Sequence, residues 1–135
     1  MKPEPRWLAL PFVLAVHGEL IALHGGPEGT ADMNRLLAAL DRPRQKQHYE
    51  DPTVFQLAAA YAFGTANGHP FTDANKRVAI TLSVVFLRIN GWRFDAPEAE
   101  TYTFTNALAA GEVEEAELAA WLERSSAAEP FRPGR

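Results

Sequence analysis

Hydrophobic residues recur at helical spacing along most of the chain, and polar or glycine-containing stretches separate them. The first such segment covers residues 11–23, and the second begins near the candidate caps Thr30 and Asp32. A third covers 54–66 and a fourth 74–89, each followed by a glycine that can end it. Apolar residues three or four positions apart form one face of a helix. The pattern therefore predicts one helix after another.

The boundaries of these helices follow from prolines and polar runs. Pro43 is expected to lie beyond the end of the second helix, and the basic residues 42–48 are expected to form a connecting loop. Asp51 followed by Pro52 is typical of a cap and a first helical residue. After a short extended piece at 92–94, two further helices are expected, at about 97–110 and 113–124.

The fourth segment differs from the others because it has almost no polar side. A helix that is apolar all round lies at the centre of a domain. We therefore predict an all-α fold, a compact helical bundle around one buried central helix. Residues 1–124 are expected to form a single domain, and residues 125–135, which show no periodicity, a frayed tail.

Composition narrows the class of protein further. The chain has 135 residues, of which 47% are hydrophobic, as expected for one domain with a core. Its formal net charge is −4, so a nucleic-acid-binding role is not expected. Because there is no cysteine, disulfides, thiolate metal sites and a cysteine nucleophile are excluded. The apolar run 7–16 is too short to span a bilayer and no cleavage site follows it, so we expect a cytoplasmic protein.

One short segment concentrates the residues that carry chemistry. Residues 69–77 read His-Pro-Phe-Thr-Asp-Ala-Asn-Lys-Arg and lead into the fourth helix. A helix N-terminus presents unpaired N–H groups and the positive end of the dipole, which favour anions. Asn75, Lys76 and Arg77 can add contacts to phosphate there, Asp73 can hold Mg²⁺, and His69 can act as a general base. The combination points to phosphoryl chemistry.

Each of these residues also has a plainer structural role when taken alone. His69 could be an ordinary loop residue, and Asp73 could cap the following helix. Lys76 and Arg77 could be solvated surface charges, although cations at a helix N-terminus oppose the dipole unless an anion binds beside them. Phe71 is expected to anchor the loop in the core under either interpretation.

The nine-residue segment closely resembles the signature motif of the Fic/Doc superfamily, and of its Doc (death-on-curing) branch in particular. Segments 18–26, 41–43 and 86–91 also resemble Doc sequences, in the same order, so the resemblance covers about residues 7–121. It implies a compact helical bundle with the motif at the head of a central helix.

The resemblance also implies an activity. Fic proteins typically transfer AMP from ATP to a hydroxyl of a target protein, but Ala74 and Lys76 here replace two glycines of their motif. Doc-type members share the lysine, which implies that ATP binds reversed and offers its γ-phosphate. The implied enzyme is a protein kinase toxin that phosphorylates elongation factor Tu and arrests translation. His69 would be the general base, Asp73 the Mg²⁺ ligand, and Asn75, Lys76 and Arg77 the phosphate clamp.

The resemblance further implies a toxin–antitoxin system with a separately encoded antitoxin. We find no inhibitory Ser/Thr-x-x-x-Glu-Gly/Asn segment in the chain, so control by an external antitoxin protein is expected. Two alternatives remain open at this point. One is transfer of AMP or another nucleotide, which Lys76 disfavours, and the other is a catalytically silent module that binds nucleotide or antitoxin.

Overall fold

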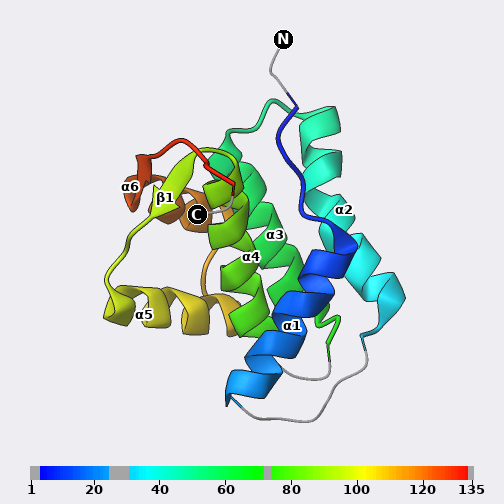
Figure 1. The fold of residues 1–135 in the computed structure, drawn as a ribbon. Coiled ribbons are helices and arrows are strands. Elements are labelled where there is room, and N and C mark those ends of the chain that lie inside the picture. The colour runs from blue at the N-terminus through cyan, green and yellow to red at the C-terminus, as the bar shows by residue number, and fades with distance from the viewer. Residues whose placement is uncertain (1–3, 25–30, 72–73, 134–135) are drawn as a thin grey trace.

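The computed structural model describes residues 4–24, 31–71 and 74–133 and shows a helical bundle with one small sheet (Figure 1). In chain order, the elements are α1 (Leu10–His24), α2 (Met33–Tyr49), α3 (Val54–Gly68), α4 (Asn75–Ile89), β1 (Trp92–Phe94), α5 (Glu98–Ala109), α6 (Glu115–Arg124) and β2 (Ser126–Ala128). The prediction of an all-α class is confirmed. None of the described helices combines the length and the hydropathy that a membrane span requires.

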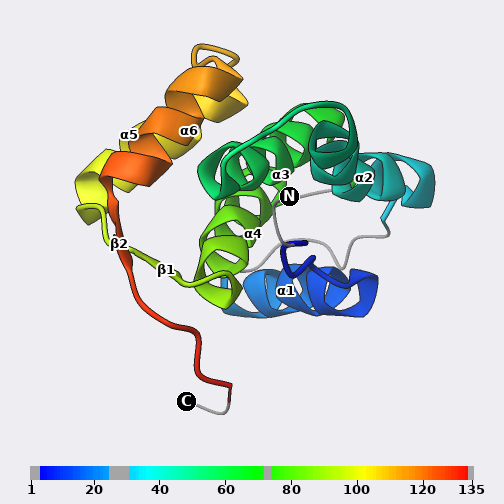
Figure 2. The ribbon, with the colours of Figure 1, turned by 90° about the horizontal axis from the view of Figure 1, so that it is seen from above.

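Two helices occupy the centre of the bundle. The views in Figures 1 and 2 place α1 and α2 on one side of α3 and α4, and α5 and α6 on the other. Helix α3 packs against α2, α4 and α6, and its run from Ala58 to Ala62 is fully buried. Nine of the 15 residues of α3 are buried, compared with six of the 15 in α4. The predicted central helix, α4, therefore shares its position with α3.

Helix α2 continues through Pro43 to Tyr49, so the connecting loop expected at 42–48 was a wrong prediction. An internal proline removes one backbone hydrogen bond and costs about 3 kcal/mol in an isolated helix. Here the ring of Pro43 is buried, and the turn beyond it is anchored to α6. Arg42 forms a salt bridge with Glu115, and Lys46 Nζ lies 3.7 Å from Glu115 Oε2. Contacts with the rest of the fold thus outweigh the tendency of a proline to end a helix.

The cap of α3 also differs from the prediction. Thr53 is the N-cap residue, one position after Pro52. Its hydroxyl accepts a hydrogen bond from the Gln56 N–H at 3.2 Å, while the Gln56 side chain accepts one from the Thr53 N–H at 2.8 Å. This reciprocal capping box satisfies two donors of the first turn at once, and it outcompetes the Asp-Pro signal just before it.

The segment after Ser125 is ordered by pairing with β1. Strand β2 runs antiparallel to β1, with Trp92 opposite Ala128 and Phe94 opposite Ser126. Just beyond β2, Glu129 Oε2 accepts a hydrogen bond from Arg88 Nη1 at 2.6 Å. The expectation of a frayed tail is therefore wrong for residues 126–129. The extended piece predicted at 92–94 is confirmed as β1, whereas the three residues of β2 are too few to show a periodicity in the sequence.

Candidate functional site

The end of α3 and the beginning of α4 meet at one end of the bundle, because the two helices are antiparallel neighbours (Figure 1). This arrangement brings His69, which follows α3, to the same end as the first turn of α4, formed by Asn75, Lys76 and Arg77. Asp73, the predicted metal ligand, lies outside the described residues.

His69 ends α3 in a left-handed conformation, with φ 48° and ψ 55°. Its backbone N–H still donates to the Thr65 carbonyl at 3.2 Å, so the residue closes the last turn of the helix and redirects the chain. The side chain is exposed, and the part of the chain that the structure describes gives the imidazole no hydrogen-bond partner. Its ring nitrogens are therefore available to a substrate hydroxyl.

Helix α4 begins after a second left-handed residue. Ala74 is the N-cap, with φ 67° and ψ 15°, and no side chain caps the helix there. The alternative role of Asp73 as a capping residue falls on a position outside the described residues. Because the Ala74 side chain offers no capping oxygen, the N–H groups of the first turn and the positive end of the helix dipole suit an anion.

Asn75 holds the loop that connects the two helices. Its Oδ1 accepts a hydrogen bond from the Phe71 N–H at 3.0 Å, and its Nδ2 donates to the Phe71 carbonyl at 2.8 Å. Both ends of the amide are therefore engaged with backbone. The direct phosphate contact expected of this side chain remains a prediction, and the structure adds a positioning role to it.

Phe71 anchors the loop in the core, as predicted, and is 4% exposed. Its ring stacks on the buried ring of His17 from α1, with centroids 4.0 Å apart and planes 7° from parallel. The segment before α2 fixes the loop from another direction, because Asp32 N donates to the Pro70 carbonyl at 2.6 Å and Ala31 forms an antiparallel bridge with Phe71. The loop between α3 and α4 is thus held on several sides.

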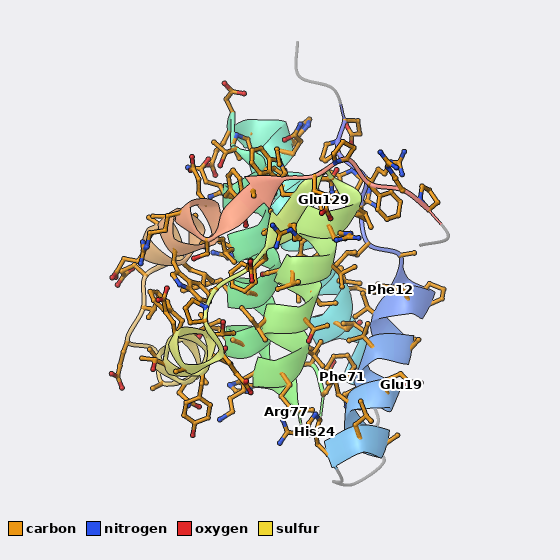
Figure 3. All side chains as sticks on the ribbon, turned by 60° about the vertical axis from the view of Figure 1, so that its left-hand side comes forward. Phe12, Glu19, His24, Phe71, Arg77 and Glu129 are labelled. Atoms are coloured by element: carbon orange, nitrogen blue, oxygen red, sulfur yellow. The ribbon has the colours of Figure 1, made fainter. Side chains whose placement is uncertain are left out.

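The two cations of the first turn differ in their surroundings. Both are exposed, but Lys76 Nζ donates to Asn106 Oδ1 on α5 at 2.8 Å. Arg77 has no ion-pair or hydrogen-bond partner among the described residues. Figure 3 shows Arg77 at the start of α4, at the same end of the molecule as Phe71 and the C-terminal end of α1. The first turn therefore carries positive charge that the described residues do not neutralise.

This arrangement suits the binding and transfer of a phosphoryl group. It combines a helix N-terminus, two exposed cations and an exposed imidazole at one end of the bundle. The sequence alone did not point to Asn106 or to His17. Neither residue belongs to a motif, and each contacts a residue far away in the chain, Lys76 and Phe71 respectively. Within the described segments, no group of three or more metal-binding side chains lies close together, so the Mg²⁺ prediction depends on Asp73.

Similarity to known proteins identifies the family of the chain. The model of the Fic/DOC family matches residues 7–87. The chain is also 38% identical over 114 residues to a protein named "Protein kinase doc" from Escherichia phage P1, a match that covers 83% of this chain and 89% of that protein. The matched regions include the whole segment 69–77 for the family model. The chain belongs to the Fic/DOC family.

Proposed function

We propose that this protein is a Doc-type toxin, a protein kinase that transfers the γ-phosphate of ATP to a hydroxyl of a target protein. The observation that carries the proposal is the first turn of α4, which presents the exposed Lys76 and Arg77 at the same end of the bundle as the exposed His69. The similarity to a protein named a kinase supports the same chemistry.

Each residue has a distinct role in the proposed reaction. His69 takes the proton from the target hydroxyl, which then attacks the γ-phosphorus, and the bond to the β-phosphate oxygen breaks to leave ADP. A positioned general base contributes about 10²–10⁴ in rate. Lys76, Arg77 and the backbone N–H groups of the first turn hold the phosphate oxygens and stabilise their charge in the transition state.

Asp73 would hold Mg²⁺ together with the phosphates of ATP. A carboxylate is the kind of hard oxygen ligand that Mg²⁺ prefers, and the ion would neutralise developing phosphate charge. Because Asp73 lies outside the described residues, the support for this role is the motif and not a measured position.

Lys76 decides which phosphate we expect to be transferred. In the AMP-transferring Fic pattern a glycine occupies this position and leaves space beside the backbone. A lysine side chain would fill that space and add a charge, which favours the orientation that presents the γ-phosphate. We therefore place transfer of AMP second.

The target and the regulator follow from family analogy. We propose elongation factor Tu as the target, so that its phosphorylation arrests translation in the cytoplasm. We also propose that a separately encoded antitoxin neutralises the protein. Both parts are proposals about partners, and they depend on the kinase assignment.

The experiment that tests the proposal is a label-transfer assay. The purified protein is incubated with Mg²⁺ and elongation factor Tu, or with bacterial lysate, and with ATP that is labelled on either the γ- or the α-phosphate. We expect label in protein from the γ-position only. Label from the α-position would instead establish AMP transfer, and no label from either would favour a silent binding module.

Two variants make the assay specific for the site. His69→Ala is expected to reduce γ-label transfer by about 10²–10⁴. His48→Ala is the matched control. His48 is an exposed histidine on α2, and its ring packs edge-on against the ring of Tyr49. Equal activity of the two variants would exclude His69 as the general base.

A further inference from the structure

We propose that Asn106 is a positioning residue that orients the Lys76 ammonium group toward bound phosphate. This inference rests on the proposed function, because it assumes that Lys76 contacts the phosphates of a nucleotide. It assigns a role to α5, which lies outside the segment 69–77 and beyond the region matched by the family model.

The geometry behind the proposal is one long-range hydrogen bond. Lys76 Nζ donates to Asn106 Oδ1 at 2.8 Å, although the two residues are 30 positions apart. A lysine side chain has about 2 kcal/mol of rotamer entropy, so a surface lysine does not keep one position without a partner. Asn106 is half-buried and lies near the end of α5, a helix that packs against both α3 and α4. A rigid element therefore presents the acceptor.

The acceptor of the Lys76 hydrogen bond is a neutral amide oxygen. An ammonium group has three donors, so one bond to Asn106 leaves two for phosphate oxygens. A carboxylate at position 106 would orient the lysine equally well but would neutralise its charge. The amide oxygen orients Lys76 and leaves its full positive charge available to an anion.

The environment of the bond agrees with this interpretation. Among the described residues, no carboxylate forms an ion pair with Lys76, whereas Arg42, Lys46 and Arg88 all do so with nearby glutamates. A cation that serves only solubility or helix packing gains by such a pair. Lys76 instead has a neutral partner at the N-terminus of a helix, where its own charge is unfavourable until an anion binds.

The test is a double-mutant cycle on the binding of MgATP, measured by calorimetry. Asn106→Leu removes the acceptor at similar size and is expected to weaken binding about five-fold, as one hydrogen bond is worth about 1 kcal/mol. In a Lys76→Met background the same change is expected to have no effect, since Asn106 acts through Lys76. Asn106→Asp is expected to weaken binding while keeping the hydrogen bond.

A matched control and a direct readout complete the experiment. Thr103→Ala removes an exposed hydroxyl of α5 that bonds only to its own helix, at Ala99, and it should leave binding unchanged. The ¹⁵N signal of the Lys76 ammonium group reports the bond without any nucleotide, because slow hydrogen exchange requires a fixed partner. We expect this signal in the unmodified protein and in Asn106→Asp, but not in Asn106→Leu.

The outcomes separate this inference from the proposed function. If Asn106→Leu leaves MgATP binding unchanged, the inference is overturned and the proposed function is not. The same holds if Asn106→Leu weakens binding equally with Lys76 present and in the Lys76→Met background. A protein that binds no MgATP and transfers no label would overturn the proposed function, and the role of Asn106 toward phosphate with it.

Discussion

Asn75 and Phe71 form a closed pair in which one side-chain amide satisfies both backbone groups of the other residue. The Asn75 Oδ1 and Nδ2 atoms lie 3.0 and 2.8 Å from the Phe71 nitrogen and oxygen. The pair joins the first turn of α4 to the loop that follows His69. The pair thereby links the proposed general base to the proposed phosphate-binding turn, and such positioning is what efficient transfer would require.

We expect Asn75→Ala to destabilise the protein by about 1–3 kcal/mol, because it leaves the two Phe71 backbone groups without partners in a half-buried position. γ-Phosphate transfer should fall as well, since the loop loses its anchor. Urea unfolding and the label-transfer assay measure the two effects.

Asn67→Ala is the matched control for this change. Asn67 Nδ2 also donates to a backbone carbonyl four residues away, that of Phe63, but on an exposed part of α3. Its replacement should change stability by less than about 0.5 kcal/mol. An equal loss in both variants would mean that the Asn75 amide has no special role.

Because His17 of α1 stacks on Phe71, we expect α1 to stabilise the loop that contains Phe71. His17→Ala should cost about 2–4 kcal/mol, because it opens a cavity beneath a buried ring. His17→Phe keeps an aromatic partner for Phe71 and should cost less. Thermal unfolding compares them, with exposed His24→Ala as the control on the same helix. A His17→Phe protein as unstable as His17→Ala would show that a polar contact of His17, not stacking, is the source of stability.

The left-handed backbone of Ala74 predicts unequal effects of two substitutions. An L-residue in this region costs about 1–2 kcal/mol, which glycine avoids. Glycine also removes a methyl group from a position that is only 7% exposed, and burial of such a group stabilises by about 0.8 kcal/mol. The two terms nearly cancel, so Ala74→Gly should change the free energy of unfolding by less than about 1 kcal/mol.

Ala74→Val should behave differently, because a β-branched side chain is strongly disfavoured at positive φ. We expect a loss above about 2 kcal/mol, measured by the same urea titration. A valine variant as stable as the glycine variant would indicate that the loop does not hold this conformation in solution.

Because Tyr61 is buried, we expect the protein to lose stability at alkaline pH. The side chain is fully buried and its hydroxyl accepts a hydrogen bond from the Leu8 N–H at 3.1 Å. Burial raises the pKa of Tyr61 above its ordinary value of 10.0. The folded state therefore binds the phenolic proton more tightly than the unfolded state does. The resulting stability is fully present below pH 10.0 and is lost as the pH rises through the folded-state pKa.

Urea unfolding at a series of pH values between about 8 and 11 tests this. Tyr61→Phe should be less stable at pH 8, because the Leu8 N–H loses its partner, but its stability should decline less above pH 10. Tyr102→Phe is the control, as Tyr102 is 71% exposed. A decline of the same size in Tyr61→Phe would assign the alkaline effect to other groups.

The sequence by itself determined the helical class, most of the helix positions and the segment that we propose as the site. Apolar residues at helical spacing predict α1, α3 and α4 because the burial of one face stabilises such helices in almost any packing. The segment 69–77 marked the site because its residue types are rare together and lie next to one another in the chain. Local order of this kind can be read without knowledge of the fold.

Tertiary structure decided what depends on contacts between distant parts of the chain. Helix α2 continues through Pro43, whose ring is buried, and Arg42 and Lys46 on either side of it pair with Glu115 of α6. Strand β2 forms because β1 offers it backbone partners. The orientation of Lys76 is set by Asn106, 30 residues further along the chain. Each of these interactions joins residues that only the folded chain brings together, so no local pattern could encode them.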